Sequence, residues 1–235
     1  MLKFRKDDKK ISNKIELVSI HIPKTAGTSF RNVLKAVYGK KSVVRFDIRS
    51  GGKKIELEQK QLKGSKLPDN IKVIHGHFRY RDLVELLEID ESIPVVTWMR
   101  DPVDRVISNY YYLAEILAKE LQEEKKGLNI LAKMQRSLIE YARNEISRNR
   151  MHKFLDGMLV DKFKFVGIQE HYEDDLADLM QALGVESFPD YHVNVTARKY
   201  DVSQETLDEI RSLNALDMEL YQEALRLRKL RKGLA

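Results

Sequence analysis

The sequence predicts an α/β fold of three αβα layers, in which helices cover both faces of a central parallel sheet. Short apolar runs alternate with amphipathic segments along the 235 residues, a pattern typical of parallel strands joined by helices. Polar clusters follow three of these runs, and ligands of open parallel sheets bind beyond the carboxyl ends of the strands. No internal repeat or low-complexity linker interrupts the chain, so a single domain over residues 1–235 is the simplest organisation.

Five runs are predicted to be strands because each is short and predominantly apolar. They are residues 17–22, 43–46, 71–75, 94–99 and 163–168. The lysine- and glycine-rich stretch 49–68 predicts a surface excursion with room for one short helix.

Helices are predicted between and after these strands. In the first, Phe30, Val33 and Leu34 recur at helical spacing, and Gly39 would end the helix in the left-handed conformation. The helix after residue 102 has a proline in its first turn, where no N–H is needed. The other helices are expected at residues 83–87, 128–150 and 172–183, and from 204 to the carboxyl end.

The composition limits the classes of function. Lys and Arg number 42 against 36 Asp and Glu, and the net charge of +6 favours an anionic partner. The absence of cysteine excludes disulfides, thiolate nucleophiles and thiolate metal sites. No apolar run approaches the roughly 18 residues of a membrane-spanning helix, and the amino terminus lacks the apolar core of a secretory signal. We therefore expect a cytoplasmic protein without a transmembrane segment.

The first polar cluster is HIPKTAGTSF at residues 21–30, between a strand and a helix. Small residues there let backbone N–H groups approach an anion at the helix amino terminus, and Lys24 adds an ammonium group. The expected anion-binding residues are Lys24, Thr25, Ala26, Gly27, Thr28 and Ser29. The lysine precedes the glycine, so the sequence is not a Walker A motif for Mg²⁺–ATP. The alternative is an ordinary strand-turn-helix corner with a solvated lysine.

The second cluster is TWMRDPVDRVISNYYY at residues 97–112. Arg100 at the strand end offers a planar fork for a phosphate, and Ser108 two helical turns later offers a hydroxyl. The alternative is that Arg100 pairs with Asp101 or Asp104. Arg105 is expected to be structural, and at least one of the three consecutive tyrosines is expected in the core.

The third cluster is VIHGHFRY at residues 73–80. His75 and His77 lie two apart, so they share a face if the strand continues that far, and an imidazole can accept a proton near neutrality. The alternatives are packed histidines at a strand end, or a metal pair, for which two histidines are too few ligands. The remaining histidines are expected to be structural, although His21 stands directly before the first cluster. They are His21, His152, His171 and His192.

HIPKTAGTSF followed by RDPVDRVISNYY resembles the carbohydrate sulfotransferase family that includes heparan sulfate 2-O-sulfotransferases. Similarity extends to RNRMHKFLDG, FVGIQEHYEDDLADL, HVNVT and LDMELYQEAL, in order along the chain. The resemblance implies a P-loop-like fold and the donor 3′-phosphoadenosine 5′-phosphosulfate (PAPS), with no metal. It assigns residues 24–29 to the 5′-phosphosulfate, Arg100 and Ser108 to the 3′-phosphate, and the role of base to His77 assisted by His75.

The resemblance further implies a hydroxyl-bearing acceptor, expected to be a carbohydrate. The heparan sulfate enzymes carry an amino-terminal membrane helix, which this sequence does not contain, so a soluble bacterial-type member is expected. Two other hypotheses stay open. One is a kinase-like phosphotransferase that uses Mg²⁺–ATP. The other is a non-catalytic binder of nucleic acid or anionic sugar, although no nucleic-acid-binding signature is present and no nucleic-acid partner is expected.

Overall fold

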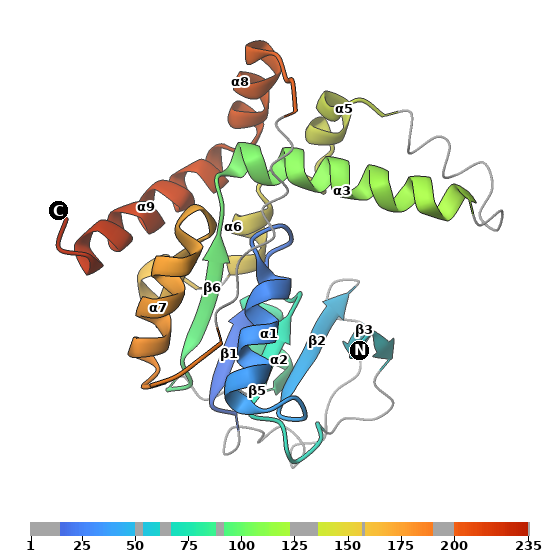
Figure 1. Ribbon diagram of the computed structural model, residues 1–235. Coiled ribbons are helices and arrows are strands. Elements are labelled where there is room, and N and C mark those ends of the chain that lie inside the picture. The colour runs from blue at the N-terminus through green and yellow to red at the C-terminus, as the bar shows by residue number, and fades with distance from the viewer. Residues whose placement is uncertain are drawn as a thin grey trace.

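A computed structural model describes residues 15–49, 54–61, 67–87, 92–122, 136–156, 158–189 and 200–234 (Figure 1). At the centre lies a seven-stranded sheet with the strand order β4-β3-β2-β5-β1-β6-β7. The strands are β1 (Leu17–Ile20), β2 (Val43–Arg49), β3 (Lys54–Leu57), β4 (Lys60–Gln61), β5 (Val73–Gly76), β6 (Val95–Met99) and β7 (Phe165–Ile168). The pairs from β2 to β7 are parallel, while β3 and β4 are antiparallel. The predicted α/β class and all five predicted strands are confirmed.

Helices flank the sheet on both faces. They are α1 (Gly27–Tyr38), α2 (Tyr80–Leu87), α3 (Pro102–Gln122), α5 (Leu138–Arg143), α6 (Arg150–Leu155), α7 (Tyr172–Ala182), α8 (Gln204–Leu213) and α9 (Ala215–Arg231), with the 3₁₀ helices η1 (Val160–Lys162) and η2 (Gln169–His171). No helix in the described ranges combines the length and the hydropathy needed to cross a bilayer.

Alternation along each strand divides the core into two layers. On one face, Phe30 and Leu34 of α1 and Leu176 of α7 pack against Trp98 of β6. On the other face, residues of α2, α6 and α9 pack against strand residues such as Ile74. Burial of these apolar side chains is the main stabilising contribution to the three-layer arrangement.

A third apolar cluster lies beyond the sheet. Val106 and Ile107 of α3 pack with Ala142 of α5 and Ile210 of α8. In Figure 1, α3 runs across the upper end of the strands, towards which β2 and β6 point, and α5 and α8 lie above it. The carboxyl ends of the parallel strands and the start of α1 therefore face α3.

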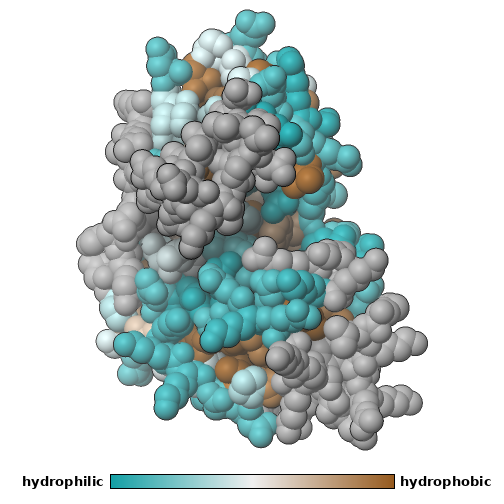
Figure 2. All heavy atoms as spheres, turned by 90° about the vertical axis from the view of Figure 1, so that its right-hand side faces the viewer, coloured by the Kyte–Doolittle hydropathy of each residue, from teal (hydrophilic) through white to brown (hydrophobic). Residues whose placement is uncertain are grey.

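The stretch 49–68 contains a hairpin where a surface excursion was expected. β2 pairs antiparallel with β3, and β3 with β4, so the described part is strand and turn rather than helix. Glu58 and Gln59 at its turn have φ of 49° and 67°. The exposed edge strand carries charged and polar side chains, which disfavour pairing with another chain. Figure 2 shows hydrophilic side chains across the middle of the face to the right of Figure 1.

Two predicted long helices are interrupted, one at Asn214 and the other over residues 144–149. The chain after residue 203 forms α8 and α9, separated at Asn214, whose buried amide donates to the Ile210 carbonyl at 2.8 Å. The segment predicted at 128–150 forms α5 and the start of α6 within its described part, and Asn149 between them is left-handed. The side-chain oxygen of Asn214 accepts from the Asn149 N–H at 2.9 Å, so the two breaks support each other. Residues 128–135 lie outside the described residues.

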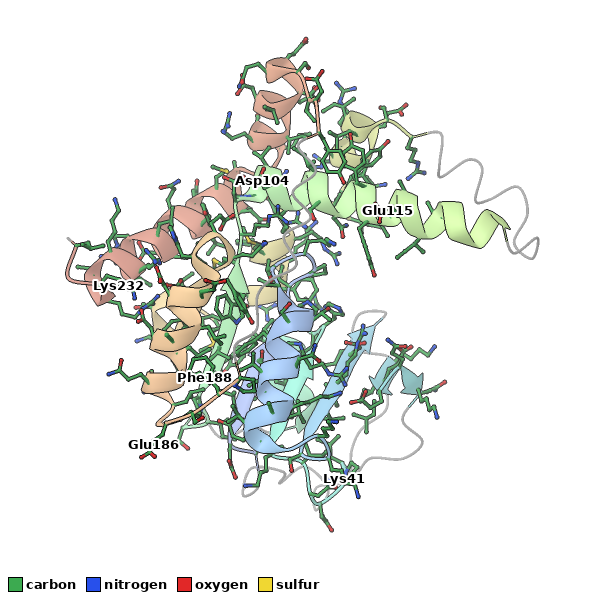
Figure 3. All side chains as sticks on the ribbon, viewed as in Figure 1. Lys41, Asp104, Glu115, Glu186, Phe188 and Lys232 are labelled. Atoms are coloured by element: carbon green, nitrogen blue, oxygen red, sulfur yellow. The ribbon has the colours of Figure 1, made fainter. Side chains whose placement is uncertain are left out.

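The basic run near the carboxyl end is engaged by acidic residues of α7. Arg228 Nε lies 2.8 Å from Asp175 Oδ1, and Lys232 Nζ lies 2.8 Å from Asp178 Oδ1 (Lys232 is labelled in Figure 3). Asp175 is fully buried and also accepts from the Ile168 N–H. These pairs fix α9 against α7 and the end of β7.

Close packing at Gly76 gives a test of the fold. A Cβ at Gly76 would lie 1.9 Å from the Phe46 carbonyl oxygen, so Gly76→Ala must displace backbone. We expect a loss of about 2 kcal/mol or more in the free energy of unfolding, measured by urea titration. Gly184→Ala is the matched control: its φ is +70° and nothing lies near its Cβ, so only the left-handed cost of about 1 kcal/mol applies. Equal losses in the two variants would contradict the close contact between β5 and β2.

Candidate active site

The loop between β1 and α1 is held in an unusual backbone conformation. Lys24 and Ala26 both have positive φ, 72° and 66°. The Thr25 hydroxyl between them is buried and donates to the Ile22 carbonyl at 2.9 Å. Left-handed residues at this turn redirect the chain so that N–H groups can converge on one point. Because its hydroxyl is engaged internally, Thr25 can offer an anion only its N–H group.

The amino terminus of α1 is open to an anion. Its cap position, Ala26, has no side chain that can accept from the helix, and the first turn contains no acidic residue. The first N–H groups and the positive end of the helix dipole are therefore not neutralised locally. Thr28 is exposed and Ser29 half-buried, so both hydroxyls lie near solvent at this end. The geometry is that of a phosphate-binding helix terminus.

Arg100 follows β6 directly, and the next residue serves as a helix cap. Asp101 Oδ1 accepts from the N–H groups of Val103 and Asp104 at 2.9 and 3.0 Å. Asp101 is thus engaged with the start of α3, and among the described residues Arg100 forms no ion pair with it or with Asp104. The guanidinium is half-buried at the carboxyl edge of the sheet.

The first two clusters meet on one face of α3. Tyr112 lies one turn after Ser108 on this helix, and Lys24 Nζ lies 4.1 Å from the centre of the Tyr112 ring. Burial lowers the pKa of Lys24, the positive charge of Arg100 lowers it further, and Glu115 raises it in part. Figure 3 shows Glu115 near the middle of α3. Two cations from different strand ends therefore act on each other in a partly desolvated place, which favours a bound anion.

The structure confirms that Arg105 is structural, whereas none of the three tyrosines is fully buried: Tyr110 and Tyr111 are half-buried and Tyr112 is exposed. Arg105 is 1% exposed and structural: its Nη2 donates to the Ser147 carbonyl at 3.2 Å and its Nε lies 4.0 Å from Asp217. Of the three tyrosines, Tyr111 packs against the third apolar cluster and stacks on Tyr200 at 3.4 Å between ring centres.

His75 is enclosed in the core beneath α1. It is 1% exposed, and its Nδ1 lies 2.9 Å from the hydroxyl of Ser19 on the neighbouring strand. Burial lowers its pKa to about 3, with further lowering by the nearby His77 and by Arg31 and Arg45. His75 is therefore a neutral, packed residue at physiological pH.

His77 has a defined tautomer. Its Nδ1 lies 2.7 Å from the carbonyl oxygen of His21, and because a carbonyl can only accept, Nδ1 carries the proton. The lone pair is consequently on Nε2. The backbone N–H of His77 donates to Asp47 Oδ1 at 2.9 Å. Burial lowers the pKa of His77, and although Asp47 and the His21 carbonyl raise it, the net shift is downward. A neutral imidazole with a free Nε2 is suited to accept a proton.

The remaining histidines differ in their surroundings. His21 lies between the clusters, with its ring stacked on those of His77 and His75 at 4.3 and 5.1 Å. The N–H of His152 donates to Asp217 at 2.8 Å, and His171 is exposed. His192 and the segment HVNVT lie outside the described residues. The described residues contain no group of three or more His, Asp or Glu placed to hold a metal ion.

Three contributors were not predicted from the sequence. Ser19 contacts His75 within β5, Asp47 accepts from the N–H of His77 just after β5, and Tyr112 contacts Lys24. The sequence signal for Ser19 and Asp47 was weak, because it consisted only of a polar residue within a mainly apolar strand. In the structure each of them is 1% exposed.

Together the fold and the site define an α/β protein with a cation-rich site and a histidine base candidate beyond the carboxyl ends of a parallel sheet. The model of the sulfotransferase family matches residues 7–222. The chain belongs to the sulfotransferase family.

Two solved structures illustrate the similarity to known proteins. A sulfotransferase from Alicyclobacillus acidocaldarius is 12% identical to this chain, with a TM-score of 0.46. The alignment covers 90% of this chain and 96% of the Alicyclobacillus chain. Mouse sulfotransferase SULT7A1, complexed with PAP, is 14% identical to this chain, with a TM-score of 0.42. The alignment covers 88% of this chain and 66% of the mouse chain. Comparison with curated proteins gave no match.

The buried His75 predicts acid sensitivity of the fold. In the unfolded chain its pKa is about 6.5, and in the folded protein about 3, so protons bind preferentially to the unfolded state between these values. The stabilisation is complete above about pH 6.5 and is lost as the pH falls towards 3. The free energy of unfolding, measured by denaturant titration at successive pH values, should rise less steeply with pH for His75→Gln than for the wild type. The exposed His171→Gln should retain the wild-type slope, and a wild-type slope in His75→Gln would contradict the assignment.

Proposed function

We propose that the protein transfers the sulfuryl group of PAPS to a hydroxyl group of a carbohydrate, within a single sulfotransferase domain. Membership of the sulfotransferase family supports the reaction class. The observation that supports the choice of donor is that Lys24 and Arg100 follow two neighbouring strands, β1 and β6, and that the charge of Arg100 lowers the pKa of Lys24. The donor has a 5′-phosphosulfate and a 3′-phosphate, and two separate cationic groups match these two anionic ends.

The proposed roles follow the chain order. Lys24 and the N–H groups of residues 25–29 hold the 5′-phosphosulfate, while Arg100 and Ser108 hold the 3′-phosphate. As the acceptor oxygen bonds to sulfur, the bond from sulfur to the bridging oxygen breaks, and negative charge grows on the 5′-phosphate. Lys24 stabilises this charge with its ammonium group. His77 Nε2 takes the acceptor proton, and the products are the sulfate ester and adenosine 3′,5′-bisphosphate.

The geometry favours His77 over His75 as the base. His75 has a pKa of about 3 and is enclosed, so an acceptor hydroxyl cannot reach it without opening the core. His77 is half-buried at the strand end, with its protonated nitrogen facing inwards. His75 then assists only by packing beneath the site.

A kinase-like phosphotransferase is the competing function. It requires Mg²⁺–ATP, and the lysine of this loop precedes the glycine, unlike the lysine of a Walker A motif. We expect adenosine 3′,5′-bisphosphate at 100 times its Kd to add about 2.7 kcal/mol of stability in a thermal-shift assay. AMP and Mg²⁺–ATP at equal concentration should add less. A larger shift with Mg²⁺–ATP would support the kinase instead.

Replacement of Arg100 tests the 3′-phosphate site. Arg100→Gln removes a charge-assisted contact of about 1.5–3 kcal/mol, so the Kd for adenosine 3′,5′-bisphosphate should rise about 10- to 100-fold in calorimetric titration. Arg143→Gln is the matched control, because Arg143 is exposed and paired with Glu209 between α5 and α8. An unchanged Kd in Arg100→Gln would place the 3′-phosphate elsewhere.

Replacement of His77 separates catalysis from donor binding. His77→Ala should reduce sulfuryl transfer from labelled PAPS to a panel of oligosaccharides by about 10²–10⁴-fold, since the general base is lost. The Kd for adenosine 3′,5′-bisphosphate should stay close to that of the wild type. His171→Ala serves as the control, and transfer at the wild-type rate in His77→Ala would exclude this base.

A further inference from the structure

We propose that His21 is a positioning residue that holds His77 in its proton-accepting orientation and links this orientation to the loop that carries Lys24. The catalytic part of this inference rests on the proposed function. The orientation and tautomer of His77 can be tested without donor or acceptor. The His21 side chain neither binds the donor in the scheme above nor accepts the proton.

His21 contacts His77 through both its backbone and its ring. The carbonyl oxygen accepts from His77 Nδ1 at 2.7 Å, which fixes the tautomer. The two rings stack with centres 4.3 Å apart and planes inclined by 27°, which limits rotation of the His77 ring. The N–H of His21 donates to the Gly76 carbonyl at 2.8 Å, so the chain on both sides of the contact is held by the sheet.

The other side of the His21 ring lies against the start of α1. A Cβ built on Gly27 would be 1.9 Å from His21 Cδ2 and 2.1 Å from Nε2. Gly27 is the first residue of α1 and belongs to the proposed phosphate-binding segment. Its lack of a side chain therefore lets the imidazole fit between the loop and the base. Any displacement of this segment must move the His21 ring, and through it His77.

The stack rests on a rigid neutral support. His75 lies 5.1 Å from His21 between ring centres, and it is held by Ser19 in the core. Burial lowers the pKa of His21, and the neighbouring His75 and His77 lower it further. His21 is consequently uncharged near neutrality, so it orients His77 without competing for the acceptor proton.

A purely space-filling role for His21 makes different predictions. Loss of a filler lowers stability and leaves the tautomer of His77 unchanged, because the backbone carbonyl remains. Loss of a positioning ring frees His77 to rotate and admits water beside it. The Nδ1–H tautomer then mixes with the Nε2–H tautomer that a solvated histidine side chain prefers in water.

The experiment is ¹⁵N NMR of histidine-labelled protein near pH 7.5 without ligand, with His77 assigned by its absence from His77→Gln. We expect a single Nδ1–H tautomer for His77 in the wild type, and in His21→Phe, which retains a stacked ring. His21→Ala should show a mixture of tautomers and at least a 10-fold lower kcat, with the Kd for adenosine 3′,5′-bisphosphate changed less than 3-fold. The exposed His171 gives the reference signal within each sample.

Gly27→Ala reaches the same ring from the loop and keeps the imidazole, so the test does not depend on one variant. It should also produce mixed tautomers of His77. A pure Nδ1–H signal in His21→Ala would overturn the positioning role, and a pure signal in Gly27→Ala alone would overturn the link to the loop. Failure of the bisphosphate to bind the wild type would instead refute the proposed function and leave the tautomer result standing.

Discussion

The site depends on the parallel pairing of β1 with β5 on one side and β6 on the other. The register aligns Ile20 with Gly76 and with Thr97, so β1 and β5 end together and β6 continues two residues further, to Met99. The loop with Lys24, His77 after β5 and Arg100 after β6 consequently lie at the same edge of the sheet. The residues of the candidate site therefore come from three separate segments of the chain. A shift of β1 by one residue would turn Ser19 and His21 away from His75 and His77.

Basic residues elsewhere in the protein are paired with carboxylates, whereas Lys24 and Arg100 at this edge of the sheet form no ion pair among the described residues. The basic run of α9 is paired with acidic residues of α7, and Arg105 has Asp217 beside it. Lys24 instead lies over an aromatic ring, and the positive charge of Arg100 lowers its pKa more than Glu115 raises it. The net charge of +6 alone does not locate a ligand, whereas the position of these two cations supports the proposed donor site.

Local patterns made part of this structure predictable. The five parallel strands and the start of α1 follow from short apolar runs and a turn of small residues, which are properties of neighbouring residues. The histidine arrangement could not be predicted fully, because His21 and His77 are 56 residues apart and meet only through the β1–β5 pairing. The β3–β4 hairpin was missed because its turn uses Glu58 and Gln59 at positive φ, where Gly or Asn is the usual signal. The break over residues 144–149 and the break at Asn214 are joined by a hydrogen bond between Asn149 and Asn214, a long-range contact that a period of 3.6 residues cannot reveal.

The central claim is that cations from two strand ends form one site for a doubly phosphorylated nucleotide. The most direct measurement is calorimetric titration of the wild-type protein with adenosine 3′,5′-bisphosphate, 5′-AMP and 3′-AMP under identical salt and pH. If both ends are held, the bisphosphate should bind at least 10-fold more tightly than either monophosphate, since each charge-assisted contact contributes about 1.5–3 kcal/mol. Equal affinity for the bisphosphate and one monophosphate would show that only one cluster binds phosphate and would contradict the account.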